Sequence, residues 1–155
     1  MKIFSGFILV LILFSCTANQ FDKDSLTFTL QPASLSAQAG FKEMPLYGTD
    51  KIFFVSDSVF LSNDHIRSAE VIDWEHQPKV KVKLTDEGRR RFADFTRQHL
   101  GKQAALLVDQ KLVSCPRVNA PITEGTLIIV GFFNHEDAVS IAAGIAPENQ
   151  ASART

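Results

Sequence analysis

Apolar and polar residues alternate in several short runs of the chain, a period of two that predicts half-buried β-strands. Such runs, or short apolar runs between turn residues, lie at residues 26–30, 51–55, 69–75, 79–84, 104–108, 111–115 and 126–131. Asp109 and Gln110 separate two of them, and the short stretch HQP separates another two. Residues 31–40 have the composition of a loop. The strands are therefore expected to pair mainly as hairpins.

A second pattern, with apolar residues three or four positions apart, predicts three helices. The longest covers residues 86–100, begins after a capping Thr85, and carries the apolar stripe of Phe92, Phe95 and His99. A short helix is expected at residues 62–71 with Ser62 as its cap. The third, at residues 134–145, is capped by Asn134, and its expected inward residues are Ala138, Ile141, Ala142 and Ile145.

Helices interspersed among hairpin-connected strands are typical of an α+β fold. We expect a single antiparallel sheet with helices packed on one face, which leaves the other face partly free. Gly88 lies one turn before Phe92 on the stripe of the longest helix. Because a glycine inside a helix costs about 1 kcal/mol relative to alanine, Gly88 predicts a close approach of this helix to the sheet.

Six basic side chains fall within the stretch PKVKVKLTDEGRRRF, residues 78–92. Alternation places Val80, Val82 and Leu84 toward the core and the three lysines of the strand on the opposite face. With a turn at residues 76–78, the expected cross-strand pairs are Glu75 with Lys79, Asp73 with Lys81 and Val71 with Lys83. In the following helix the expected pairs, four residues apart, are Asp86 with Arg90, Glu87 with Arg91 and Arg90 with Asp94.

These pairs largely neutralise the basic stretch, which argues against a nucleic-acid surface and leaves an anion or phosphate site as the alternative. The chain as a whole has 16 Lys and Arg against 17 Asp and Glu. A nucleic-acid-binding domain usually shows a strongly basic balance or face. We therefore expect no nucleic-acid partner.

The N-terminus has the layout of a secretory signal: Lys2, about twelve mostly apolar residues, and then small residues. The apolar run is too short for the roughly 20 residues of a membrane span. Residues 13–16, LFSC, resemble a bacterial lipobox, which predicts cleavage before Cys16 and attachment of lipid, with acyl chains such as palmitate, to its thiol. Cleavage after Ala18 is the alternative. Thr17 favours the outer membrane in a cell that has two membranes.

Candidate catalytic and metal-binding residues are few. His65, His76, His99 and His135 lack the spacing of a metal site, and no glycine-rich phosphate loop or nucleophile elbow is present. Cys115 could act as a nucleophile, but a lone thiol in a strand is more often a packing residue. We expect no enzyme activity, no cofactor, no metal and no small-molecule substrate, with a Cys115-dependent hydrolase as the least supported alternative.

Several motifs together resemble the head subdomain of the first periplasmic domain of SecD, a membrane protein that assists the Sec translocase. Residues 85–96 fit the pattern TxEGxxxFxxxT, and residues 106–118, LLVDQKLVSCPRV, resemble that family's AIVLDGKVISAPVI hairpin. Gln110 replaces the glycine of that hairpin's Asp-Gly turn, so a different turn geometry is expected. The family-motif positions, for which a structural role is expected, are Thr85, Glu87, Gly88, Phe92, Thr96, Asp109, Pro116, Gly125, Gly131 and Phe133.

The N-terminal signal, the composition and this resemblance together predict the following organisation: a lipoprotein signal peptide at residues 1–15, a tether at 16–25, a head-like domain at 26–146 and a disordered tail at 147–155. We therefore expect a lipid-anchored, periplasm-facing envelope module without transmembrane helices. Its expected partners are unfolded or exported polypeptides, or Sec translocase components. The alternative is an interaction lipoprotein that reuses the fold for one folded partner or for self-assembly, without a role in export.

Overall fold

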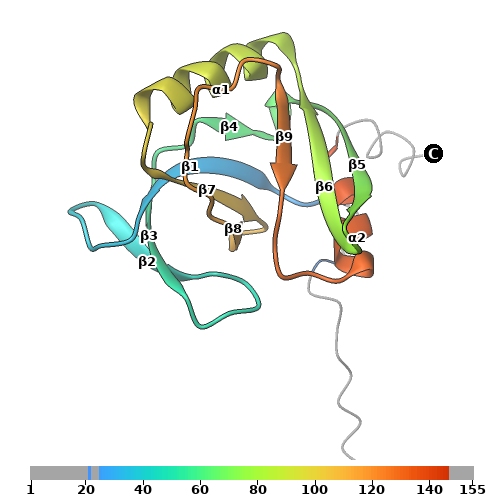
Figure 1. Cartoon of the computed structure of the whole chain (residues 1–155), viewed down its shortest axis with the longest axis horizontal. Coiled ribbons are helices and arrows are strands. Elements are labelled where there is room, and N and C mark those ends of the chain that lie inside the picture. The colour runs from blue at the N-terminus through green and yellow to red at the C-terminus, as the bar shows by residue number, and fades with distance from the viewer. Residues whose placement is uncertain (1–20, 22–24, 147–155) are drawn as a thin grey trace, which may run out of the picture.

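The computed structural model describes residue 21 and residues 25–146, which form two antiparallel sheets and two α-helices (Figure 1). The six-stranded sheet contains β1 (Phe28–Ser34), β2 (Phe41–Pro45), β3 (Ile52–Ser56), β4 (Leu61–Ser62), β7 (Gln103–Val108) and β8 (Lys111–Ser114). The three-stranded sheet contains β5 (Ile66–Trp74), β6 (Gln77–Leu84) and β9 (Thr126–Ile129). A 3₁₀ turn, η1 (Asn63–His65), joins β4 to β5, and the helices are α1 (Asp86–Gln98) and α2 (His135–Ile145).

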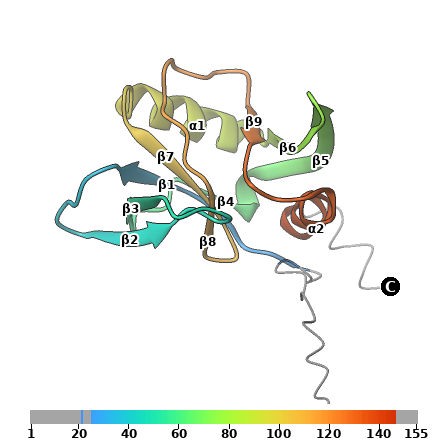
Figure 2. The same cartoon turned by 60° about the horizontal axis from the view of Figure 1, so that its bottom comes forward.

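The α+β class is confirmed, but the expectation of a single sheet is wrong. The strand order is β2-β3-β1-β7-β8 in one sheet, with β4 also on β1, and β5-β6-β9 in the other. The sheets are separate because β9 pairs with β6 and not with the preceding strand β8. Figure 2 shows the two sheets at an angle to one another, with α1 across one end and α2 beside β5 and β6.

The main core lies between the two sheets and the helices. Leu30 and Leu106 of the six-stranded sheet, Val82 of the three-stranded sheet, Phe95 of α1 and Ile141 of α2 are all fully buried in it. The other face of the six-stranded sheet carries a smaller apolar cluster, which includes Ala105 and Leu107 of β7. The run AALLV is apolar throughout because both faces of β7 are covered.

Two strand predictions and one helix prediction differ from the structure. β1 continues to Ser34, through part of the expected loop, because residues 28–33 pair with β7. β2 was not predicted, since FKEMP has no clear alternation. The expected helix at residues 62–71 is only the single turn η1, after which β5 begins at Ile66. The β-branched residues of β5 pack in a sheet against β6, and this pairing overrides the capping signal at Ser62.

The predicted register of the β5–β6 hairpin is also wrong. The turn is formed by Glu75 and His76, both with positive φ (54° and 64°), and not by residues 76–78. Lys81 therefore lies opposite Glu70, and their side chains form an ion pair of 3.3 Å. The predicted burial of Val80, Val82 and Leu84 is nevertheless confirmed, because the alternation along β6 does not depend on the register.

The prediction of a different turn geometry in the β7–β8 hairpin is wrong. Asp109 and Gln110 have φ values of 48° and 64°. Positive φ at both central residues is the signature of a type I′ turn, so the turn keeps this geometry without the glycine.

The helix caps follow the sequence. Thr85 Oγ1 accepts a hydrogen bond from the Gly88 amide at 3.1 Å, and Asn134 Oδ1 accepts one from the Asp137 amide at 2.8 Å. Of the predicted charge pairs in α1, Glu87 with Arg91 is present at 3.0 Å. Asp86 and Asp94 do not pair with Arg90: Asp86 lies 3.8 Å from Arg67, and Asp94 lies 2.8 Å from Arg97.

The predicted signal peptide, the lipid-attachment residue Cys16 and the predicted tail lie outside the described residues. Phe21, which the sequence analysis assigns to the tether, instead belongs to the core: it is fully buried and its ring contacts that of Tyr47 at 5.3 Å. Within the described part of the chain, neither helix has the length and apolar character needed to cross a bilayer.

Candidate functional site

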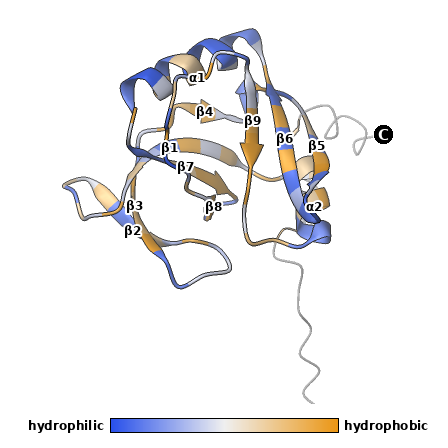
Figure 3. Ribbon diagram, viewed as in Figure 1, coloured by the Kyte–Doolittle hydropathy of each residue, from blue (hydrophilic) through white to orange (hydrophobic). Residues whose placement is uncertain are grey.

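An apolar groove of about 440 Å³ opens between β9, α1 and the segment that connects β8 to β9, and we call it the α1–β9 groove. Its lining residues come from β1, α1, β7, β9 and this connecting segment: Leu30, Phe92, Thr96, Ala104, Leu106, Pro116, Arg117, Val118, Asn119, Ala120, Ile122, Thr126, Leu127 and Ile128. A groove of this size is in the range of known ligand pockets, about 300 to 1,000 Å³. Figure 3 shows β9 mostly in the orange of apolar residues.

One wall of the groove is an edge strand without a partner on its outer side. β9 pairs with β6 and with no other strand among the described residues. Its sequence, TLII, contains no charged residue and no proline. An edge strand exposes main-chain amides and carbonyls that can pair with another chain, and proteins commonly protect such edges with charges, proline, bulges or a covering segment. β9 is short, at four residues, but it has no charge or proline, and its pairing with β6 has no bulge.

The floor of the groove consists of core side chains. Phe92 of α1 is 3% exposed, and Leu30 and Leu106 are fully buried below it. The rim is more accessible, with Ile122 and Ile128 partly buried. An occupant can therefore exchange water for apolar contacts along the whole depth of the groove.

Thr96 holds the opposite wall in place. Its side chain is buried, and Oγ1 donates to the Ala93 carbonyl at 3.1 Å and accepts from the Ile122 amide at 3.0 Å. The second bond fixes the segment that leads into β9. The last threonine of the TxEGxxxFxxxT motif is thus a contact between α1 and the groove wall.

Two further motif positions shape the same wall. Gly125 has φ +72°, a conformation that favours glycine, and its carbonyl accepts from the Leu84 amide at 2.9 Å at the start of β9. The carbonyl of Pro116 accepts from the Ala104 amide at 2.9 Å, so the hydrogen bonding along this side of β7 continues past the end of β8. Phe92, Thr96, Pro116 and Gly125, which are far apart in sequence, therefore meet around the groove.

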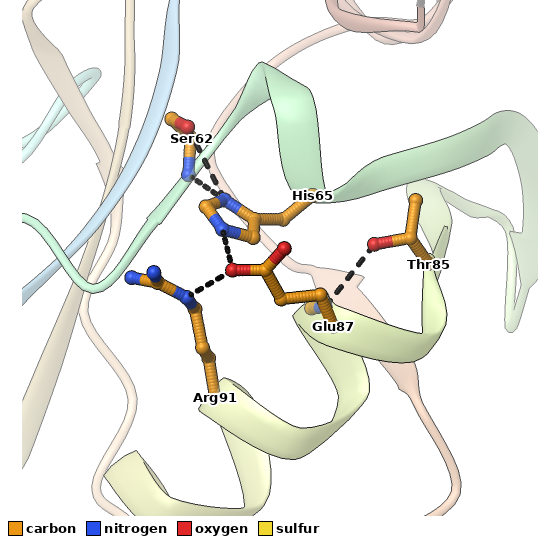
Figure 4. Close-up of polar contacts among 6 residues, drawn as sticks. Ser62, His65, Thr85, Glu87 and Arg91 are labelled. Atoms are coloured by element: carbon orange, nitrogen blue, oxygen red, sulfur yellow. Dashed lines mark hydrogen bonds and ion pairs between the residues drawn. The ribbon is translucent and has the colours of Figure 1, made fainter.

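Glu87 and Gly88 join the beginning of α1 to η1 (Figure 4). Glu87 Oε1 lies 3.0 Å from Arg91 Nε and 3.8 Å from His65 Nε2. A Cβ on Gly88 would lie 2.6 Å from the His65 carbonyl oxygen and 3.2 Å from Cβ of Leu84, so the predicted close approach is made to η1 and also to the end of β6. The Thr85 amide donates to the same carbonyl at 2.9 Å.

Ser62, His65 and Glu87 form a row with the composition of a hydrolytic triad. The Ser62 amide donates to His65 Nδ1 at 3.1 Å, and the Ser62 hydroxyl lies 3.2 Å from the same nitrogen. Because the amide already occupies the Nδ1 lone pair, the ring is not placed to take a proton from the hydroxyl. The arrangement fixes η1 against α1.

The remaining motif positions lie at the β8 side of the molecule. The Asp109 amide donates to the Thr27 carbonyl at 2.8 Å. A Cβ on Gly131 would lie 2.5 Å from both the Val113 carbonyl oxygen and the Phe133 ring. Gly131 thereby allows the β9–α2 connection to lie against β8.

Cys115 is a partly buried free thiol packed against the smaller cluster. Burial raises the pKa of Cys115 from 9.0 to about 12. A nucleophilic cysteine requires its thiolate form, and at neutral pH this thiol stays protonated. In the described residues, no three His, Cys, Asp or Glu side chains are grouped as a metal ion requires. Asp137 of the HED stretch is buried at the beginning of α2.

The outer face of the three-stranded sheet is a second exposed surface. By alternation and register it carries Trp74, Lys79, Lys81 and Ile128, opposite the buried face of β6. Trp74 is 58% exposed, and Lys79 Nζ lies 5.1 Å from the centre of its ring. This face corresponds to the partly free sheet face that the sequence analysis expected.

The groove could not be predicted from the sequence because its walls depend on tertiary structure. Ile122 falls at the family's spacing but Ile128 belongs to no motif, and nothing in TLII reveals which strand pairs with it. The one available signal was the lack of charge in residues 126–133 together with the glycines at 125 and 131.

A family model described as SecDF, P1 head subdomain, matches residues 41–146. The chain is 40% identical over 83 residues to the protein translocase subunit SecD of Dictyoglomus turgidum, and 38% identical over 85 residues to that of Leptotrichia buccalis. These matches cover 53% and 54% of this chain but only 21% of each relative. The chain thus spans about a fifth of the length of these curated relatives.

Two solved structures share the fold. A structure of SecDF described as a membrane component that enhances protein export aligns with a TM-score of 0.64 and 18% identity, over 82% of this chain and 63% of that one. The crystal structure of SecDF in a super-membrane-facing form gives a TM-score of 0.63 and 18% identity, over 80% of this chain and 18% of that one. The expected resemblance in fold is confirmed.

Proposed function

This chain belongs to the SecDF P1 head subdomain family, and from that premise we propose that it is a non-catalytic binding module that engages exported polypeptides. The observation that carries the proposal is the α1–β9 groove, an apolar hollow bordered by an uncharged strand edge. The relatives are translocase subunits by name, which supports a role in export for this chain as well.

The groove suits an extended, unfolded segment. Such a segment can add to the edge of β9 as a further strand, where main-chain hydrogen bonds supply affinity that does not depend on sequence. Alternate side chains of the segment would then enter the apolar depth over Phe92 and Leu106. This mode of binding tolerates many sequences, which a module that engages different exported proteins requires.

The second part of the proposal is the location. We propose that the lipobox at residues 13–16 is processed, that Cys16 carries lipid, and that the domain faces the periplasm from a membrane, with the outer membrane favoured. Two or more acyl chains give stable anchoring. Labelling cells with a radioactive fatty acid tests this: incorporation that is lost in Cys16→Ala supports the anchor, and unlabelled protein contradicts it.

A substitution at the edge of β9 tests polypeptide binding. In Ile128→Glu the new carboxylate faces Lys81 across the β6–β9 pair, so the fold is expected to tolerate it, while a charge enters the groove. We expect the affinity of the full chain, held in lipid nanodiscs, for a fluorescent unfolded secretory protein to fall about tenfold or more, roughly 1.4 kcal/mol. The matched control is Ile52→Glu on β3, where Ile52 is 41% exposed.

Equal binding by wild type, Ile128→Glu and Ile52→Glu would contradict a role for the groove. Undetectable binding by the wild-type protein would contradict polypeptide binding altogether.

The outer face of the three-stranded sheet supports a second candidate, an interaction module for one folded partner or for self-assembly. The observation in its favour is Trp74, because exposed tryptophan is enriched among residues that dominate protein interfaces. A single stoichiometric partner, captured by wild type and lost in Trp74→Ala but retained in Thr96→Val, which alters the wall of the groove, would favour this candidate over export.

A further inference from the structure

A polar pocket of about 410 Å³ adjoins the α1–β9 groove, and Arg117 lines both. The pocket lies between the β1–β2 loop and the segment before β7, and its polar lining includes Ser34, His99, Lys102 and Gln103. The two hollows also meet along the chain, since Gln103 lines the pocket and Ala104 lines the groove. We call it the Arg117 pocket.

The charges of the Arg117 pocket are all of one kind. Lys102 and Arg117 both line it, and no Asp or Glu does. Within the described part of the chain, neither cation has a carboxylate partner, whereas Arg91 and Arg97 of α1 are both paired. An unpaired arginine beside a second cation favours a planar anion that can accept two hydrogen bonds, as a carboxylate does.

We infer that the Arg117 pocket receives a carboxylate of the polypeptide whose apolar segment lies in the α1–β9 groove. The carboxylate is either the chain terminus or an acidic side chain, because both present the same group. This inference rests on the proposed function and adds a preference to it: apolar segments that end in, or are flanked by, a negative charge bind best. Arg117 is the residue that couples the two sites.

Three fluorescent peptides test the inference with the full chain in lipid nanodiscs. All contain the same ten-residue apolar segment; one ends in a free carboxylate, one in an amide, and one in glutamate followed by an amide. We expect one or both carboxylate peptides to bind about three- to tenfold more tightly than the plain amide, the range of a partly exposed charge-assisted pair. The peptide that binds more tightly than the plain amide shows whether the bound carboxylate is the chain terminus or an acidic side chain.

Charge variants provide the second readout. Arg117→Gln is expected to remove the advantage of the carboxylate peptides, and Lys102→Gln to reduce it. Arg90→Gln, an equal change of charge at an exposed position of α1, is the matched control and should preserve the advantage. Should Arg117→Gln fold poorly, Lys102→Gln carries the test.

The outcomes separate the two proposals. If all three peptides bind with the same affinity, the carboxylate inference is overturned and the groove proposal stands. If none of them binds, the groove proposal fails as well. An advantage that survives both Arg117→Gln and Lys102→Gln places the carboxylate elsewhere and overturns the assignment to this pocket.

Discussion

The strands β9 and β2 are both edges of their sheets, yet they present very different surfaces. β2 has the sequence FKEMP, with Lys42 and Glu43 exposed and Pro45 at its end, and Lys42 is paired with Asp57 at 2.9 Å. β9 has the sequence TLII and lies beside an apolar groove. Charges and proline discourage a second chain from pairing with β2. The difference indicates that one edge is closed to other chains and the other is available for them.

Two of the other outer strands, β5 and β8, fall on the protected side of this comparison. β5 carries Arg67, Glu70 and Asp73, and its pairing shifts between Ile66 and Ser68. β8 is covered by the segment after β2: the Tyr47 amide donates to the Leu112 carbonyl at 2.8 Å. The edge of β9 differs from these strands in carrying no charge, and the proposed binding of extended polypeptides makes use of this difference.

The largest expected effect on stability comes from truncating Phe21, which packs against the segment that covers β8. Phe21 is fully buried against Tyr47, and Lys111 Nζ lies 4.8 Å from the centre of the Phe21 ring. Phe21→Ala should lower the free energy of unfolding by about 3 to 5 kcal/mol, the usual cost of truncating a buried phenylalanine. Urea unfolding measures it. Leu35→Ala, at a side chain that is 67% exposed, is the control and should change stability by less than about 0.5 kcal/mol.

A loss below about 1 kcal/mol for Phe21→Ala would mean that residue 21 does not belong to the folded domain. The boundary of the domain would then return to the position predicted from the sequence.

A smaller effect is expected from Thr96, which supports the open edge. Thr96→Val removes the acceptor of the Ile122 amide, and an unsatisfied buried donor costs about 1 to 3 kcal/mol. We expect weaker binding of unfolded polypeptide in addition, because the groove wall loses its link to α1. Thr96→Ser keeps the hydroxyl and is the control. If valine and serine variants bind equally well, the hydrogen bond does not maintain the groove.

The smallest effect is on stability at alkaline pH and concerns Cys115; at neutral pH no effect of its ionisation is expected. Its pKa is raised to about 12 in the folded protein, above the ordinary 9.0, because burial disfavours the thiolate. The folded state therefore holds this proton more tightly, and the resulting stability is complete below about pH 9 and lost as the pH rises toward 12. Unfolding measured from pH 8 to 11 should show a shallower decline in Cys115→Ala.

The pKa of Tyr47 is also raised, chiefly by burial and further by Asp137, so some decline should remain in Cys115→Ala. A decline identical to that of wild type would show that Cys115 titrates normally and is accessible, which would reopen a chemical role for the thiol.

The sequence predicted what depends on local patterns. Alternation identified the buried face of β6, and side-chain caps identified Thr85 and Asn134 as the residues before the two helices. It failed where pairing between distant segments decides the structure. The two-residue turn at Glu75 and His76 shifted the predicted register, and pairing with β6 turned the expected helix after Ser62 into β5.

The groove is one of the features that depend on contacts between distant segments. The motif residues Phe92, Thr96, Pro116 and Gly125 were identified from their spacing. They come together at the groove only because the segment between β8 and β9 packs against α1 in the folded protein. The open edge of β9 could not be predicted either, because it depends on which strands pair with β9 in the folded protein.

Site-specific photo-crosslinking in cells tests the central claim most directly. A photoreactive residue replaces Ile128 at the open edge and, in a matched variant, Glu43 at the charged edge of β2. We predict a broad set of adducts with many exported proteins from position 128 and few from position 43. A single discrete adduct at position 128, or equal adducts at both positions, would contradict the claim that the edge of β9 engages exported polypeptides.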